Sequence, residues 1–250
     1  MSVRQAIEEL DRFSLTLDSD CQEYWRFHRK RYFWTGDLLN QLIGQLRSKR
    51  GNKITLLDIG LCYQTLLFLK LFPDISIHTL GYRDGRYIHE GKLKHIDCDL
   101  NDTYYPGKCT NEHFYNYDVI TMLEVIEHLY TSPLQVFIYL NQLLRPGGLL
   151  VVQTPNAVSL SKRIAMLKGY NPFEQIRDNM RENPGHFREY TRHELCHMAT
   201  LRGFTIKEEH MVNYFSPPSD LQGRLISKLS EVLPGDFREG MTLIFTKAES

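Results

Sequence analysis

The sequence has no excess of positive or of negative charge. Its 250 residues include 30 Lys or Arg and 30 Asp or Glu, so the formal net charge is zero. A neutral composition argues against a surface built mainly to hold nucleic acid and leaves room only for a local basic patch. Long apolar runs are missing too, since no stretch reaches about twenty apolar residues, and we expect a soluble protein. The first residues are polar and acidic, unlike a signal peptide.

Cysteine is scarce and shows no pairing pattern. The cysteines are scattered, odd in number and without a Cys-x-x-Cys pair. This pattern predicts reduced thiols of a cytoplasmic protein rather than a disulfide framework or a zinc ribbon. The five residues are Cys21, Cys62, Cys98, Cys109 and Cys196.

Short apolar runs alternate with helical patterns from residue 53 onward, without internal repeats. Such alternation predicts βαβ units and a doubly wound, mostly parallel sheet of the α/β class. The last two strand-like runs have a helical pattern between them, so we expect them to pair antiparallel near the sheet edge. The runs that predict strands are 53–60, 75–82, 93–100, 117–125, 149–155, 205–212 and 240–248.

Two regions stand apart from this alternation. Residues 1–50 have a helical pattern, which Gly36 and Asp37 are expected to interrupt, and we interpret them as an N-terminal helical lid on a domain that spans 51–250. Residues 157–185 are too polar for core and too long for a bare loop, which predicts a partly helical cap. After it, Thr191 and Glu194 form a capping box that predicts a helix start.

Doubly wound sheets bind ligands beyond the carboxyl ends of their strands. The polar residues that follow the predicted strands should therefore gather at one rim. They fall in residues 58–60, 82–84, 97–100, 124–128 and 154–156.

The segment EVIEH places two carboxylates and an imidazole on that rim. If a helix begins near Glu124, then Glu124, Glu127 and His128 share one helical face. Oxygen ligands with one imidazole suit a hard or borderline divalent cation. Alternatively His128 acts alone as a general base, with Glu124 orienting it or touching a cofactor. A third interpretation is that the carboxylates only stabilise a helix N-terminus.

In its motifs the sequence resembles the class I S-adenosylmethionine-dependent methyltransferases. The similar segments are LLDIG, DVITMLEVIEHL, LLRPGGLLVVQTPN and HFREYTRHELCHMATLRGFTIKEE, and they cover roughly residues 50–210. The resemblance implies a Rossmann-like, doubly wound, seven-stranded sheet whose last strand is antiparallel. It also implies a cofactor site over the first two strands and a substrate site over the fourth and fifth.

The same resemblance implies individual cofactor contacts. Gly60 ends the first strand, where the backbone approaches the methionine part of the cofactor, but Leu61, Cys62 and Tyr63 stand where further glycines are usual. Asp84 is the carboxylate nearest to the position that grips the ribose hydroxyls, and Asp99 matches the one that faces the adenine. The full implied set is Asp58, Gly60, Tyr63, Asp84, Asp99, Leu100 and Met122.

Two methyltransferase groups resemble this sequence at the Glu–Glu–His cluster. The ubiquinone-pathway O-methyltransferases carry Glu-x-x-Glu-His, and the small-RNA 3′-terminal 2′-O-methyltransferases add a later histidine, which His186 matches. The implied metal ligands are Glu124, Glu127, His128 and His186, for Mg²⁺ or Mn²⁺. Such an ion lowers the pKa of a substrate hydroxyl and aims its oxygen.

Two further patterns have alternative interpretations. The string HELCH at 193–197 matches a zinc-protease motif, but Glu194 belongs to the capping box and no good third ligand follows. The aromatic and basic stretch at 24–33 fits nucleic-acid binding, a lid over the cofactor, or an amphipathic helix whose basic stems lie on the sheet.

The sequence thus predicts a cytoplasmic, S-adenosylmethionine-dependent O-methyltransferase with His128 and Glu124 in catalysis. The balanced charge and the short cap favour a small-molecule or sugar (glycan) hydroxyl as acceptor. One alternative is an RNA 3′-end 2′-O-methyltransferase with a metal site. The other is a non-catalytic protein that keeps the fold to bind a partner.

Overall fold

A computed structural model of the chain describes residues 1–51, 53–82, 93–105, 107–109, 116–177, 185–215 and 220–248. The chain divides into two compact units, residues 1–97 with 214–216, and residues 98–213 with 217–250. Within the described ranges, every helix is too short or too polar to cross a membrane.

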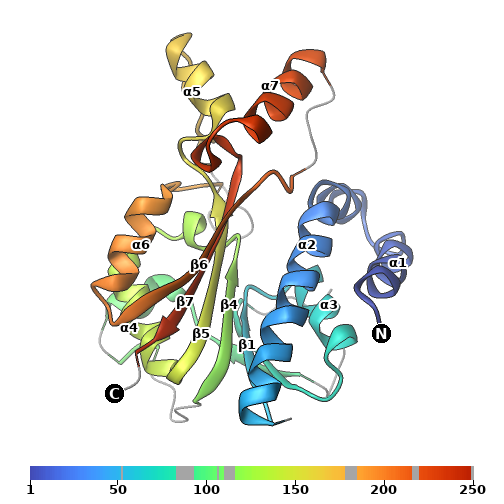
Figure 1. Cartoon of the computed structure of the whole chain (residues 1–250), viewed down its shortest axis with the longest axis vertical. Helices are drawn as coiled ribbons and strands as arrows, with labels where there is room; N and C mark the ends of the chain where they lie inside the picture. The colour runs from blue at the N-terminus through green and yellow to red at the C-terminus, as the bar shows by residue number, and fades with distance from the viewer. Residues whose placement is uncertain are drawn as a thin grey trace. The chain divides into compact units, whose positions relative to one another are not determined.

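The first unit begins with helices that pack against one another (Figure 1). A capping box between Ser2 and Gln5 starts the first of them, which buries one apolar face. The strands of this unit pair in parallel, β1 with β2 and β2 with β3. The elements are α1 (Val3–Ser14), α2 (Ser19–Arg50), β1 (Thr55–Ile59), α3 (Tyr63–Leu71), β2 (Ser76–Gly81) and β3 (Lys94–Asp97).

The expected break at Gly36 and Asp37 is wrong, because α2 runs through both residues without interruption. Gly36 instead allows a close approach of α1. A Cβ at this position would lie 2.9 Å from Cγ1 of Val3, closer than real side chains come. The glycine therefore serves helix packing, which a pattern along one helix does not reveal.

The second unit contains the remaining strands, with α4 and α6 packed against them and α5 and α7 in contact beyond one end (Figure 1). Strand β4 pairs with β5 in parallel, and β7 pairs antiparallel with both β5 and β6. The elements are η1 (Leu100–Tyr104), β4 (Tyr117–Leu123), η2 (Ile126–His128), α4 (Pro133–Leu143), β5 (Leu144–Pro155), α5 (Leu160–Leu167), α6 (Arg192–Thr200), β6 (Phe204–Val212), α7 (Leu221–Val232), η3 (Gly235–Phe237) and β7 (Gly240–Lys247).

The strand order of the sheet is β3-β2-β1-β4-β5-β7-β6. The predicted α/β class, the seven strands and the antiparallel last strand are all confirmed. Every residue of β4 is buried, as its continuous apolar run predicted. The cap region contains α5, and the capping box at Thr191 starts α6 as expected.

The prediction that all cysteines are reduced is wrong for one pair. Cys98 and Cys109 form a disulfide, with Cα atoms 5.9 Å apart. The turn η1 folds the chain back between them, and eleven residues of separation without a motif give no sign of this in the sequence. Cys21, Cys62 and Cys196 are free thiols.

Candidate active site

Glu127, His128 and His186 form the centre of the candidate site in the second unit. One ligand atom from each lies within 4.8 Å of the others. Glu127 and His128 belong to η2, directly after β4, and His186 precedes α6. The carboxylate of Glu127 is fully buried, and its Oε2 accepts a hydrogen bond of 2.8 Å from the Thr154 hydroxyl on β5. The sequence predicted Glu127 and His128 on one rim and the resemblance implied His186, and the structure brings the three together.

The ring of His128 is held in one tautomer. Its Nδ1 lies 2.8 Å from the carbonyl oxygen of Gly185, and because a carbonyl oxygen only accepts, Nδ1 carries the proton. The other nitrogen, Nε2, then has a lone pair and lies 3.8 Å from Oε1 of Glu127. The side chain is 33% exposed, so a substrate can reach it. This arrangement suits a proton acceptor or a metal ligand.

His186 is oriented in the same manner by a carboxylate. Its Nδ1 lies 3.1 Å from Oε1 of Glu189, and its ring packs edge-on against His128 with centroids 4.8 Å apart. Burial, followed by the neighbouring His128, lowers the pKa of His186 to about 4. At neutral pH the ring is therefore uncharged, and Nε2 is left as a second acceptor nitrogen.

Sequence reasoning missed Lys162 and Glu189. Lys162 projects from α5, and its ammonium binds Oε2 of Glu189 and donates to the backbone oxygen of Asn156 at 3.1 Å. Burial lowers the pKa of Lys162 to about 8, while the carboxylates of Glu239, Glu124 and Glu127 act to raise it. Glu189 stands three residues after His186, and this spacing is the sequence signal for the pair, whereas nothing in the sequence singles out Lys162.

Glu124 is placed differently from the expectation. The helix expected to begin there is only the short 3-10 turn η2, and α4 starts at Pro133, so Glu124 does not share a helical face with Glu127 and His128. Its φ is +56°, a left-handed conformation that costs energy in a non-glycine residue, and its N–H donates to the Gln153 carbonyl at 2.8 Å. Backbone strain of this kind is concentrated at functional sites.

Among the described residues of the first unit are three of the implied cofactor contacts. Gly60 has a φ of +84° and donates its N–H to the Leu80 carbonyl at 3.0 Å, so this turn does require glycine. Asp58 is fully buried and accepts hydrogen bonds from Gln64 at 3.1 Å and from Thr65 at 2.6 Å. Its carboxylate therefore helps to fix the turn between β1 and α3.

The side chain of Tyr63 lies in the core of the first unit. It is fully buried, packs on Trp25 and Tyr32, and donates its hydroxyl to the Cys21 carbonyl at 3.1 Å. Only the backbone of Tyr63 is therefore available to a ligand. Tyr63, which stands where a further glycine is usual, therefore connects the turn after β1 to α2.

A buried basic pair lies beside this turn. The Nε of Arg31 donates to Nδ1 of His28 at 3.1 Å, and both side chains are buried. Burial, and then the charge of Arg31, lowers the pKa of His28 to about 2, so the imidazole is neutral. One basic residue of the stretch at 24–33, Arg31, is thus buried in the first unit, and the interpretations of the whole stretch stay predictions.

The remaining implied contacts are distributed as follows. Asp99 caps η1 by accepting from the Asn101 N–H at 2.9 Å, and Leu100 beside it is buried. Met122 lies in β4 with its side chain fully buried, so it offers the ligand rim no side-chain surface. Asp84 lies outside the described residues.

In the zinc-protease string HELCH, the glutamate has a structural role. Glu194 accepts from the N–H and the hydroxyl of Thr191 and pairs with Arg188 at 2.6 Å. Among the residues described, the cluster that fits a metal ion is Glu127, His128 and His186, which includes neither histidine of the string.

Comparisons with known proteins agree with this fold. The methyltransferase domain family matches residues 24–209. The small RNA 2′-O-methyltransferases of Mus musculus and Rattus norvegicus are each 29% identical over 141 residues, which is 52% of this chain. The match spans 34% of the length of each of these relatives.

Solved methyltransferases share the fold. A SAM-dependent methyltransferase from Archaeoglobus fulgidus has a TM-score of 0.54 at 19% identity and covers 92% of this chain and 100% of its own. The 1,6-didemethyltoxoflavin-N1-methyltransferase of Burkholderia thailandensis has a TM-score of 0.55 at 11% identity and covers 100% of this chain and 92% of its own. The chain belongs to the methyltransferase domain family, and its fold is that of the class I, S-adenosylmethionine-dependent methyltransferases.

Proposed function

We propose that the chain methylates a ribose hydroxyl and that His128 accepts the proton from that hydroxyl. The observation that carries the proposal is the hydrogen bond of His128 Nδ1 to the Gly185 carbonyl, which leaves Nε2 of a partly exposed ring to accept a proton. The bound cofactor supplies an electrophilic methyl group on sulfur. The acceptor oxygen forms the new bond to carbon, the carbon–sulfur bond breaks, and the proton goes to Nε2 of His128. Glu127, buried beside the ring, stabilises the imidazolium that results.

A ribose is favoured as the acceptor by the curated relatives. Both are named for methylation of a 2′ oxygen of small RNA, and the shared 141 residues amount to 52% of this chain. The balanced charge of the sequence fits a short contact with an RNA end better than a long duplex. A small-molecule sugar offers the same hydroxyl chemistry and is an outcome of the test below.

A bound divalent cation is the alternative to a metal-free His128 base at this site. Glu127, His128 and His186 supply one oxygen and two nitrogens within 4.8 Å, and the hydrogen bonds to both Nδ1 atoms orient both Nε2 atoms for ligation. Oxygen and imidazole donors suit Mn²⁺ or Mg²⁺. Such an ion would lower the pKa of the acceptor hydroxyl. Glu124 lies outside this donor set.

The test uses an RNA oligonucleotide with a 3′-terminal ribose and the same oligonucleotide with a terminal 2′-deoxyribose. We expect methyl transfer from labelled S-adenosylmethionine to the first and none to the second. His128→Ala should lower the rate about 100-fold or more, the usual contribution of a general base. Equal transfer to the deoxy oligonucleotide would overturn the ribose assignment, and no transfer to RNA or to free sugars would favour the non-catalytic alternative.

Rate assays with a chelator and with added Mn²⁺ distinguish His128 as a base without an ion from a site that uses a metal ion. A rate that is unchanged by chelator leaves His128 as a base without an ion. A rate that chelator abolishes and Mn²⁺ restores, in wild type but not in Glu127→Gln, supports the ion.

A further inference from the structure

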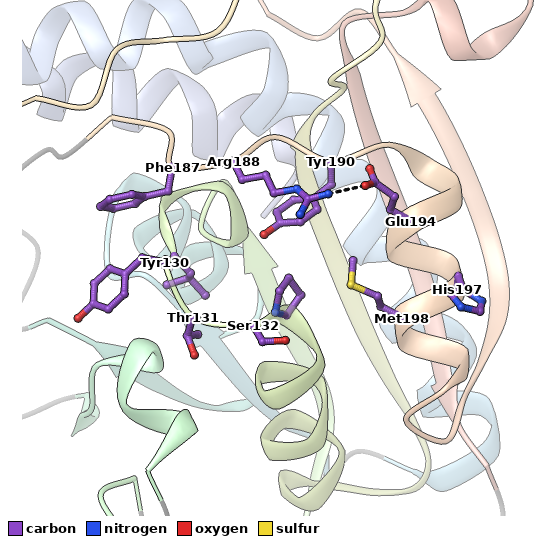
Figure 2. A pocket seen from close by; sticks show the side chains of 11 residues that line it. Tyr130, Thr131, Ser132, Phe187, Arg188, Tyr190, Glu194, His197 and Met198 are labelled. Carbon is purple, nitrogen blue, oxygen red and sulfur yellow. Dashed lines mark hydrogen bonds and ion pairs between the residues drawn. The ribbon is translucent and has the colours of Figure 1, made fainter.

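A groove of about 600 Å³ opens beside the candidate site, within the second unit (Figure 2). Its walls come from residues 129–133, from Phe187, Arg188 and Tyr190, and from three residues of α6. Figure 2 shows Tyr130 and Phe187 at one end and His197 and Met198 at the other. None of the residues implicated so far in catalysis or cofactor binding lines it.

The residues of the groove directly follow those of the candidate site along the chain. The backbone N–H groups of Phe187 and Arg188 donate to the carbonyl oxygen of Glu127 at 2.8 and 3.3 Å. Leu129, at the start of the groove, directly follows His128. The wall of the groove is therefore hydrogen-bonded to the turn that carries Glu127 and His128.

Aromatic rings form the end of the groove that adjoins the site. The rings of Tyr130 and Phe187 meet edge to face with centroids 5.5 Å apart. Tyr130 is 64% exposed, which leaves much of a large ring uncovered. An exposed aromatic pair offers a stacking surface for a flat ring.

Polar groups line the rest of the groove. The hydroxyl oxygen of Thr131 is buried and has no hydrogen-bond partner among the described residues, and Ser132 makes no side-chain cap on α4. The charges of Arg188 and Glu194 balance each other at 2.6 Å. Beyond the aromatic end the lining is thus polar and charged, which suits a base or sugar with polar edges better than an apolar tail.

We infer that this groove binds the nucleobase next to the methylated ribose, stacked on the exposed ring of Tyr130 with the ring of Phe187 edge-on beside it. The inference rests on the proposed function, because it takes the acceptor to be an RNA end. It adds that the enzyme holds its acceptor by a neighbouring base, in a sequence-tolerant way, since every base has a face that stacks.

The experiment compares two acceptors, an RNA oligonucleotide and the same oligonucleotide with an abasic residue next to the terminal nucleotide. For the wild-type enzyme we expect the abasic acceptor to lower kcat/KM about ten-fold. Tyr130→Leu and Phe187→Leu should lower kcat/KM by a similar factor on the intact acceptor and have no further effect on the abasic one. Tyr130→Phe, which keeps the ring, should retain the wild-type value.

A direct binding measurement accompanies the kinetics. The fluorescent base 2-aminopurine, placed next to the terminal nucleotide, should be quenched on binding to wild type and remain bright with Tyr130→Leu. If the variants lower kcat/KM equally on both acceptors, or leave it unchanged, the groove does not bind the base, although ribose methylation by the wild type still supports the proposed function. If the wild type transfers no methyl group to either RNA, both proposals are overturned.

Discussion

The Thr154 hydroxyl donates a 2.8 Å hydrogen bond to Oε2 of Glu127, and both side chains are fully buried. Thr154→Val removes this donor and leaves the buried carboxylate of Glu127 with one hydrogen bond fewer. We expect a loss of ~1–3 kcal/mol in the free energy of unfolding, from the usual value of such a bond. Methyl transfer should fall about ten-fold, because Glu127 stabilises the charge on His128. Denaturant unfolding and steady-state rates measure both effects, and Thr154→Ser should restore them.

Lys162 should control the alkaline side of the pH–rate profile. Because its pKa is about 8, the ammonium loses its proton above that pH, and Glu189 and the acidic cluster lose their buried cation. We expect kcat to fall above pH 8 in wild type. Lys162→Arg, which stays protonated, should shift that fall to higher pH, and Lys162→Met should lower kcat at every pH.

The matched control for Lys162 is cofactor affinity. Calorimetric titration with S-adenosylmethionine should give the same Kd for wild type, Lys162→Arg and Lys162→Met. A weaker Kd in step with the lower kcat would contradict a role for Lys162 in orienting the cluster.

Glu124 has a left-handed backbone, with a φ of +56°. Glycine adopts this conformation without the cost that other residues incur, so Glu124→Gly should be more stable than Glu124→Ala by about 1 kcal/mol. The two variants lack the same carboxylate, so both should lose methyl transfer to a similar extent. Thermal or denaturant unfolding provides the comparison. Equal stability of the two variants would mean that the turn relaxes when the side chain is absent.

Much of the fold was predictable because it is recorded in local periodicity. The continuously apolar run of β4 and the capping box at Thr191 are confirmed, as is the antiparallel pairing of β6 with β7. Part of the site was predictable because the polar residues that follow parallel strands lie at one edge of the sheet. Glu127, His128 and His186 do meet.

The remainder depends on contacts between distant segments. Spacing of i, i+3 and i+4 fits an α-helix at Glu124, but the carbonyl of Gln153 on the neighbouring strand takes its N–H and fixes a turn instead. The approach of Lys162 to Glu189 joins α5 to a segment 27 residues away. No local pattern encodes such a pair. The roles of the implied cofactor contacts stay predictions.

Acid should destabilise the fold through His28. Its pKa falls from 6.5 in the unfolded chain to about 2 in the folded protein, so between these values the unfolded chain binds more protons. Stability is therefore fully present above pH 6.5 and is lost as the pH falls, by at most ~1.4 kcal/mol per pH unit for this one group.

The check is urea unfolding between pH 7.5 and 5, with His28→Gln as control. Glutamine retains an acceptor for Arg31 but does not titrate. The variant should lose less stability than wild type over this range, and an identical slope for the two proteins would show that His28 does not titrate on unfolding.

The packing of Tyr63 has a consequence for how this enzyme can be dissected. The residue that begins α3, beside the glycine turn, has its ring between aromatic side chains of α2 and its hydroxyl on the Cys21 carbonyl. The amino-terminal helices are thus not a detachable module. A chain that lacks residues 1–50 would expose the Tyr63 ring on the segment that follows Gly60. Such shortened chains should be insoluble or unable to bind the methyl donor, even though every residue of the His128 cluster is still present.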